Sequence, residues 1–350
     1  MKDGATNGRM RAVILLSGGL DSTLAAKLLL DQGIELHAIH FTSPFCTCSR
    51  TRADGTDAAG AGCRSQAQVI AGELGIPIRT VSKGTGYVEV LRSPRHGRGA
   101  AMNPCIDCRV FTLRMAREYM EEIGASFLVT GEVVGQRPMS QREDAFRIIE
   151  RESGCRGLVL RPLSAKHFEP TIPEREGWID REKLLHIVGR SRKEQIRLAR
   201  DLELPDTPCP AGGCLLTERS FSRKVRDLLD HVEAPDMVEM NLLKVGRHFR
   251  MPDGRKAIVA RNETENRRLE ALCRGRHTVY VADGFSGPSV SVQGGNGAFP
   301  DDLLRKIYTR YSKPGTPAPF PVRELSPAGE RRRTLAADDD FTEVQRALLA

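Results

Sequence analysis

The sequence of 350 residues has no stretch that approaches the roughly 20 apolar residues that a membrane-spanning helix needs. Its start, MKDGATNGRMR, contains no apolar core of the kind found in signal peptides. From these absences we expect a cytoplasmic protein with no membrane partner. Acidic residues are outnumbered: 45 Asp and Glu stand against 53 Lys and Arg, which gives a formal charge of +8 and a pI of about 9.1. Such a balance favours polyanionic partners.

Hydrophobic residues make up 40% of the chain and charged residues 28%, as is usual in folded globular proteins. Because single cores rarely grow beyond about 250 residues, we expect two folded domains and a tail. The nine cysteines are not expected to form structural disulfides in a reducing compartment, so they serve packing, metal binding or catalysis.

Strand and helix signals alternate along the first part of the chain. Apolar segments at 12–16, 34–41 and 77–82 are separated by helical periodicity at 21–33 and 65–75. A long helix at 105–124, strands at 125–132 and 158–164, and helical segments within 181–204 follow. This order predicts right-handed crossovers, and therefore an α/β fold with a doubly wound parallel sheet over residues 1–235.

The pattern changes near Asn241. Apolar and polar residues alternate around an Asp-Gly hairpin signal, and we predict a smaller α+β domain at 241–311. Residues 312–350 are Pro-rich and charged, a composition typical of a flexible tail. The basic run at 190–200 fits either a solvated helix face or an RNA contact.

The stretch SGGLDST at 17–23 directly follows the first apolar segment. Gly18 and Gly19 allow a tight turn with exposed N–H groups, and Ser17 and Ser22 add hydroxyls, so the loop suits an anion at a helix start. The sequence here matches neither GxGxxG nor GxxxxGK[ST]. Asp21 suits Mg²⁺ beside a phosphate, although a simple turn with a helix-start carboxylate explains the same residues.

The whole string resembles the PP-loop of the ATP pyrophosphatases, which have the adenine nucleotide α hydrolase-like fold, split ATP between its α and β phosphates and adenylate a substrate. The resemblance implies ATP and Mg²⁺ as cofactors and Asp21 as a catalytic residue. It also places Ser17, Gly18, Gly19, Asp21, Ser22 and Thr23 at the nucleotide. A second stretch, TGEVVGQRPMSQ at 130–141, resembles the TGE…GQ…SQ segment of the 4-thiouridine synthetases and implies that Gly131 and Gln136 bind the nucleotide.

Two cysteine pairs lie far apart in the sequence, in NPCIDCR (Cys105 and Cys108) and in CPAGGC (Cys209 and Cys214). By spacing alone they suit a redox disulfide, a zinc site or an iron–sulfur cluster. In one group of tRNA thiolases, a similar arrangement of three cysteines holds a 4Fe-4S cluster with one iron open. That resemblance implies Cys105 and Cys108 as ligands. The GGCLL around Cys214 resembles the position of the second cysteine in the 2-thiouridylases. It implies Cys214 as the third ligand, with Cys209 as the alternative, and Cys105 and Cys214 as catalytic residues.

The other cysteines have weaker indications. Cys46, Cys48 and Cys63 flank an expected loop and could bind a metal or relay sulfur, although packing is the simpler explanation for each. Cys155 and Cys273 have no partner in the sequence and are expected to be structural or exposed thiols.

The segment from Leu242 to Tyr308 resembles the RNA-binding domain of NFACT proteins. In the usual 4-thiouridine synthetase, a ferredoxin-like region and a THUMP domain precede the PP-loop, whereas only residues 1–11 precede the first expected strand here. We therefore expect tRNA to be bound by the C-terminal domain.

Together these resemblances predict an ATP-dependent tRNA uridine thiolase, a tRNA sulfurtransferase that adenylates a uracil carbonyl oxygen and replaces it with sulfur from sulfide or a cysteine desulfurase. Three alternatives stay open: a cluster-free persulfide enzyme, a PP-loop ligase acting on a small molecule, and a non-enzymatic RNA-binding factor. The sequence leaves the oligomeric state open.

Overall fold

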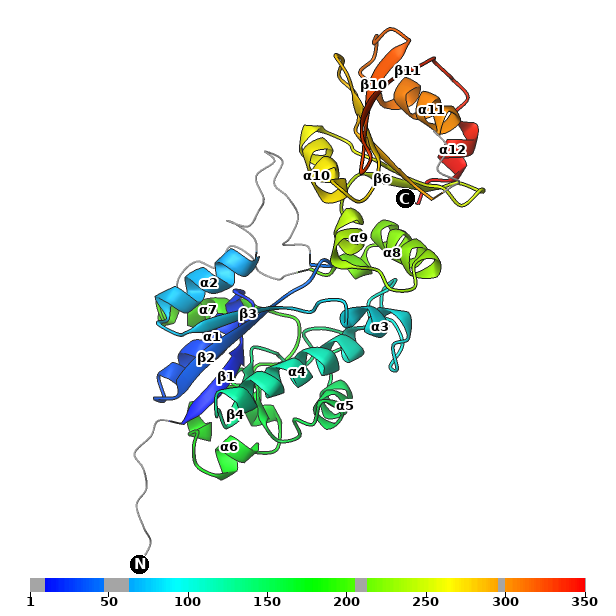
Figure 1. The fold of residues 1–350 in the computed structure, drawn as a ribbon. Coiled ribbons are helices and arrows are strands. Elements are labelled where there is room, and N and C mark those ends of the chain that lie inside the picture. Colours follow the sequence, from blue (N-terminus) through cyan, green and yellow to red (C-terminus); the bar gives the residue numbers. More distant parts are fainter. Residues whose placement is uncertain (1–9, 47–62, 205–212, 295–299, 350) are drawn as a thin grey trace, which may run out of the picture. The chain divides into compact units, whose positions relative to one another are not determined.

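A computed structural model describes residues 10–46, 63–204, 213–294 and 300–349 (Figure 1). The chain divides into two compact units. The first unit contains the described residues up to Cys214 except Ala100–Met102, and the second contains Ala100–Met102 and the described residues from Leu215 onward. Within these ranges, no helix is both long and apolar enough to cross a membrane.

The first unit is built on a five-stranded parallel sheet with the order β3-β2-β1-β4-β5. Its strands are β1 (Arg11–Leu15), β2 (Glu35–Thr42), β3 (Ile78–Ser82), β4 (Phe127–Thr130) and β5 (Val159–Leu160). Their apolar, β-branched composition suits strands that are covered on both faces. The predicted parallel sheet is confirmed.

Helices cover both faces of this sheet (Figure 1). The main ones are α1 (Leu20–Leu30), α2 (Cys63–Glu73), α4 (Cys105–Glu122) and α5 (Glu143–Ser153). Ile14 of β1 packs in one core with residues of α1 and α2, whereas Val13 packs in the other core with residues of α4 and α5. Alternate side chains of one central strand therefore hold the two layers of helices, as in a doubly wound fold.

The strand order creates a crevice at one edge of the sheet. The chain runs from β1 outward to β3 and then returns to β4 on the other side of β1. Ligands of open α/β sheets bind beyond the carboxyl ends of the strands at such a switch point. The loops that follow β1 and β4 carry SGGLDST and TGEVVGQRPMSQ, so the topology brings the two motifs together.

Shorter helices complete the first unit: α3 (Tyr87–Arg92), α6 (Ile172–Arg175) and α7 (Lys193–Asp201). The prediction of helix in the earlier part of 181–204 is largely wrong, since only a short 3-10 turn (Arg181–Lys183) forms there. The chain beyond this turn pairs with a neighbouring segment: Leu185 N–H donates to Pro162 O (2.9 Å) and Ile187 N–H to Leu163 O (2.8 Å). Pairing with a neighbouring segment thus outweighs the local helical periodicity.

The second unit contains a six-stranded antiparallel sheet with the order β11-β10-β8-β9-β7-β6. The strands are β6 (Arg247–Arg250), β7 (Lys256–Val259), β8 (Val279–Ala282), β9 (Val290–Gln293), β10 (Phe320–Ser326) and β11 (Gly329–Leu335). The helices are α8 (Arg219–His231), α9 (Met237–Leu242), α10 (Glu263–Cys273), α11 (Asp301–Tyr311) and α12 (Thr342–Arg346). A smaller α+β domain is confirmed.

Residues 312–350 are not a flexible tail over their described part. They add β10, β11 and α12 to the second unit, and Phe320, Val322 and Leu335 are buried in its core. The composition is misleading because β11 is an edge strand, where charged side chains prevent pairing with other chains.

The first unit is shorter than the predicted 1–235 domain, because α8 belongs to the second unit. Asp227 of α8, 5% exposed, lies 2.7 Å from Nε of Arg250 and 2.8 Å from Nζ of Lys256. Burial acts to raise the pKa of Asp227, but Arg250 and Lys256 outweigh it and lower this pKa. The buried ion pairs tie α8 to β6 and β7.

We expect Asp227→Asn to destabilise the second unit by about 3–5 kcal/mol, because the substitution leaves the buried Lys256 and the partly buried Arg250 without their counter-charge. Asp253→Asn is the control, since Asp253 forms an exposed pair with Arg255 and its loss should cost at most about 1 kcal/mol. Unfolding by urea, followed in full-length protein, measures both.

The pH dependence provides a second readout. A carboxylate with a lowered folded pKa contributes stability above its unfolded pKa, and that contribution disappears as the pH falls through the folded pKa. The advantage of the wild type over Asp227→Asn should therefore be full above the ordinary value of 3.8 and be lost as the pH falls further, through the lowered pKa of the folded protein. Equal stability of the two proteins at neutral pH would contradict this assignment.

Candidate active site

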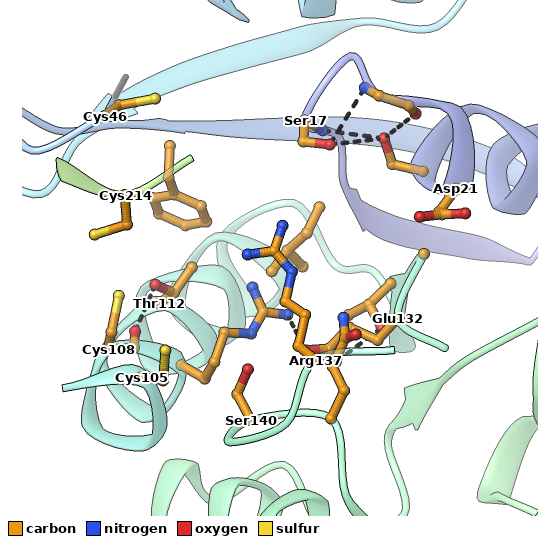
Figure 2. A pocket seen from close by; sticks show the side chains of 18 of the residues that line it. Ser17, Asp21, Cys46, Cys105, Cys108, Thr112, Glu132, Arg137, Ser140 and Cys214 are labelled. Atoms are coloured by element: carbon orange, nitrogen blue, oxygen red, sulfur yellow. Dashed lines mark hydrogen bonds and ion pairs between the residues drawn. The ribbon is translucent and has the colours of Figure 1, made fainter. Parts of the chain in front are cut away.

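A cavity of about 350 Å³ lies in the first unit, at the carboxyl edge of its sheet. It is lined by residues that follow β1, β2, β3 and β4 and by the start of α4. Figure 2 shows the phosphate loop on one side and cysteines on the other. The lining includes Ser17, Gly19, Asp21, Ser22, Gly131 and Gln136, six of the eight residues predicted to bind the nucleotide.

The remaining two predicted residues shape the loop. Gly18 has φ +76°, and a Cβ there would lie 2.6 Å from the backbone N of Ala67 in α2. Thr23 is fully buried, and its hydroxyl donates to Gly19 O at 3.1 Å. Neither residue lines the cavity, but both fix the backbone conformation of the loop.

Serine hydroxyls close the loop on itself. Ser22 Oγ donates to Gly19 O (2.9 Å) and accepts from the N–H of Ser17 (3.3 Å). Ser17 Oγ lies 3.0 Å from Ser22 Oγ and accepts from the N–H of Gly19 (3.3 Å). These hydrogen bonds fix the conformation of the turn just before α1. Backbone N–H groups and the helix dipole favour an anion at this position.

Asp21 lies in the first turn of α1 and faces the TGE segment. Gln136 Nε2 donates to its Oδ2 at 3.1 Å, and Arg192 Nη2 lies 3.8 Å from the same atom. Burial raises the pKa of Asp21, and the Gln136 hydrogen bond and the charge of Arg192 oppose the rise. Its other oxygen, Oδ1, is buried and has no hydrogen-bond partner among the described residues. Mg²⁺ is usually bound by one or two carboxylates, and an oxygen without a hydrogen-bond partner fits the role of such a ligand.

Glu132, in the loop after β4, forms ion pairs with two arginines. It is buried, and it pairs with Arg109 Nη2 at 2.8 Å and Arg161 Nε at 3.4 Å. Arg161 in turn contacts Glu150 and lies 3.9 Å from the ring centre of Phe146. Glu132 therefore anchors Arg109 on the cavity wall.

The predicted cysteines lie on the same cavity. Cys105 and Cys108 start α4, and Cys214 forms an antiparallel bridge with Cys46; all four residues line the cavity. In Figure 2 the thiols of Cys105, Cys108 and Cys214 lie in one region, opposite Ser17 and Asp21. Cys46 is an addition that the sequence alone did not favour, since its partner in the bridge is distant in sequence.

The two thiols of α4 differ in acidity. Lys83, directly after β3, places Nζ 2.9 Å from Cys108 Sγ. Burial acts to raise the pKa of Cys108, but the charge and hydrogen bond of Lys83 and a hydrogen bond with Tyr87 outweigh it, so this pKa is lowered. Burial and the neighbouring Cys108 raise the pKa of Cys105. Cys108 is therefore the more readily ionised thiol.

The cysteines implied as ligands, Cys105, Cys108 and Cys214, line the same cavity, but they are not arranged as a metal site. Among the described residues, no three His, Cys, Asp or Glu side chains form a group that could hold a metal ion. Cys209 and Cys48 lie outside the described residues. Cys155 and Cys273 are buried outside the cavity, as expected for structural thiols.

Cations are more numerous than carboxylates in the cavity lining. Lys83, Arg109, Arg137 and Arg192 stand against Asp21 and Glu132. Arg192 belongs to the basic run at 190–200, so this member of the run faces the cavity. The sequence analysis missed Lys83 and Arg109, because only the fold brings them to the phosphate loop. It also did not single out Arg137, which directly follows Gln136 in the 130–141 segment.

Comparisons with known proteins agree with the two units. Residues 6–169 match the family model described as thiamine biosynthesis protein (ThiI), and residues 246–341 match NFACT protein RNA binding domain. A tRNA-specific 2-thiouridylase MnmA of Janthinobacterium sp. (strain Marseille) is 26% identical over 69% of this chain and 62% of its own length. A probable tRNA sulfurtransferase of Lysinibacillus sphaericus (strain C3-41) is 32% identical over 45% of this chain and 35% of its own length.

Among solved structures, a 4-thiouridine synthetase in complex with RNA and ATP is similar at 21% identity, with a TM-score of 0.34, over 67% of this chain and 52% of that chain. The chain spans about three fifths of the length of the first curated relatives, 62% and 59%. Residues 6–169 are thus similar to the ThiI family, and residues 246–341 are similar to the NFACT RNA-binding domains.

Proposed function

We propose that this chain is an ATP-dependent tRNA sulfurtransferase that adenylates a uracil carbonyl oxygen and replaces it with sulfur. One observation carries the proposal: a single cavity holds both an anion-binding loop and a group of thiols. Phosphoryl chemistry and sulfur chemistry can then act on the same substrate carbon without its release.

In the first step, the loop after β1 would bind the β and γ phosphates of ATP through backbone N–H groups and the hydroxyls of Ser17 and Ser22. Asp21 would hold Mg²⁺, which neutralises charge on the phosphates. The uracil oxygen attacks the α-phosphorus, the bond from this phosphorus to the bridging oxygen breaks, and pyrophosphate leaves. Stabilising the charge of that leaving group is the main catalytic task.

In the second step, a sulfur nucleophile attacks the activated carbon and AMP leaves. The donor set of Cys105, Cys108 and Cys214 fits an iron–sulfur cluster chemically, since three thiolates leave one iron open. A 4Fe-4S cluster would supply an iron site that holds sulfide from the donor. Lys83 favours the thiolate form of Cys108 that such a ligand needs.

The Lys83 contact also favours a second route without a cluster. A lowered thiol pKa suits Cys108 as the carrier of a persulfide. Its terminal sulfur would attack the carbon, a second cavity thiol would then break the sulfur–sulfur bond, and a dithiol reductant would reopen the resulting disulfide.

The second unit supports RNA as the substrate over a small molecule. Its residues 246–341 match the NFACT RNA-binding family. The edge strand β11 presents Arg331 and Arg332, both exposed. Such guanidinium groups suit phosphate contacts, which supply most of the affinity for nucleic acids.

Asp21→Asn should abolish ATP-dependent AMP formation while ATP still binds, because the substitution removes the proposed ligand of Mg²⁺. We expect a loss of about 100-fold or more in the rate, the scale of several kcal/mol of transition-state stabilisation. Asp31→Asn at the other end of α1 removes an equivalent charge from an exposed pair with Lys27 and should leave the rate unchanged. Chromatographic measurement of AMP tests both, and an active Asp21→Asn protein would refute the role.

Serine substitutions at Cys105, Cys108 and Cys214 should each abolish formation of thionucleosides in tRNA, because each removes a thiol from the sulfur end of the cavity. Cys155→Ala is the matched control, since Cys155 is buried outside the cavity. Mass spectrometry of tRNA nucleosides provides the readout.

Metal analysis of the same proteins separates the two routes. For the cluster, anaerobically purified wild type should contain iron and absorb broadly in the visible range, and each of the three serine variants should lose both signals. An active wild type without iron would overturn the cluster and leave the persulfide route, and stoichiometric zinc would overturn it equally.

Arg331→Ala combined with Arg332→Ala should weaken tRNA binding and flatten its salt dependence, with the slope of log K against log salt reduced by about 1 to 2. The charge-matched control combines Arg142→Ala, just before α5, with Arg147→Ala on α5; both residues are exposed. Filter binding over a series of salt concentrations measures the slope. An unchanged slope in the β11 variant would contradict the RNA contact at this strand.

A further inference from the structure

Arg137 lies in a turn whose backbone is tightly held. The N–H of Gly135 donates to Gln141 O at 2.7 Å, and the N–H of Gln141 donates to Arg137 O at 3.2 Å. Gly135 has φ +75°, and a Cβ there would lie 3.4 Å from Gly189. The turn is also fixed to the phosphate side of the cavity, because Gln136 donates to Asp21.

The side chain of Arg137 points into the space between the phosphate loop and α4 (Figure 2). In the same view, Ser17 and Asp21 lie on one side of this space, and Cys105 and Cys108 lie on the other. The side chain of Arg137 therefore lies between the phosphate loop and the thiols of α4.

The other arginines of the cavity are held at its walls. Arg109 pairs with Glu132 at 2.8 Å, and Arg192 lies 3.8 Å from Asp21. Both therefore lie beside a carboxylate of the protein. The side chain of Arg137 comes from the turn after Gln136 and extends into the centre of the cavity.

The α-phosphate of ATP must occupy this centre in both proposed steps. In adenylation its oxygens gain charge as the uracil oxygen bonds to phosphorus and pyrophosphate departs. In sulfur transfer the bond from the uracil carbon to oxygen breaks, and AMP leaves with the electron pair. A planar guanidinium can donate two hydrogen bonds to phosphate oxygens at once.

We propose that Arg137 is a catalytic residue that binds the α-phosphate oxygens of ATP, and later of the AMP leaving group, from the side opposite the phosphate loop. This role rests on the proposed function. In both steps, one residue outside SGGLDST would then stabilise the negative charge that develops on the α-phosphate in the transition state.

The test uses full-length Arg137→Ala and Arg137→Lys with ATP, Mg²⁺ and unmodified tRNA. Single-turnover AMP formation should slow by about 100- to 1,000-fold in Arg137→Ala, the scale for loss of one preorganised donor. The KM for ATP should change only a few-fold, because the interaction strengthens in the transition state. Arg137→Lys should recover part of the rate, and added guanidinium should partly restore Arg137→Ala.

Arg142→Ala is the control, since Arg142 lies just beyond the same turn but pairs with Asp144 at 2.7 Å on the surface. Its rate should equal that of the wild type. Arg137→Ala with a wild-type rate, or with a defect confined to the KM for ATP, would overturn the role of Arg137 and leave the proposed function intact. A wild type that forms no AMP with tRNA would overturn both.

Discussion

The loop after β4 meets the first turn of α1 so closely that only glycine fits at position 131. A Cβ on Gly131 would lie 2.5 Å from the carbonyl carbon of Asp21 and 2.5 Å from the nitrogen of Ser22. This contact sets the distance over which Gln136 reaches Asp21 and fixes the origin of the turn that carries Arg137. Gly18 imposes a similar limit on the other side, where the phosphate loop packs against α2. The two glycines thus determine the shape of the cavity before any catalytic side chain is considered.

Electrostatics then explains why the cavity has more cations than carboxylates. The proposed reaction brings a polyphosphate close to thiols that must ionise, and like charges in a partly buried site repel strongly. Lys83 lies 2.9 Å from Cys108 and would offset the charge of its thiolate, while Arg137 faces the phosphate loop across the cavity. Arg161, only 5% exposed, fixes Glu132 and so keeps Arg109 in place. A cation thus lies close to each place where negative charge is expected.

The sequence predicted the parallel sheet because apolar strands and amphipathic helices alternate with short connections, and each of these signals is local. It also predicted that the loops after β1 and β4 lie together, since both follow parallel strands. It could not predict Lys83, because a lysine after a strand shows no pattern until the strand order is known. It named Cys46 as a residue that could bind a metal or relay sulfur, but packing was the simpler explanation. Residues 312–350 were assigned to a tail for a related reason. Their prolines and arginines dominate the composition, whereas only three buried side chains, Phe320, Val322 and Leu335, tie β10 and β11 to the sheet.

The thiols and the phosphate loop come from different parts of the sequence, so the two ends of the cavity are assembled in different ways. The loop after β1 is complete within the residues from Ser17 to Thr23 and their hydrogen bonds. The sulfur end, in contrast, needs α4, the end of β3 and the segment at Cys214 together. The hydrogen bonds that close the phosphate loop are therefore local, whereas the thiols meet only when α4, the end of β3 and the segment at Cys214 are all in place.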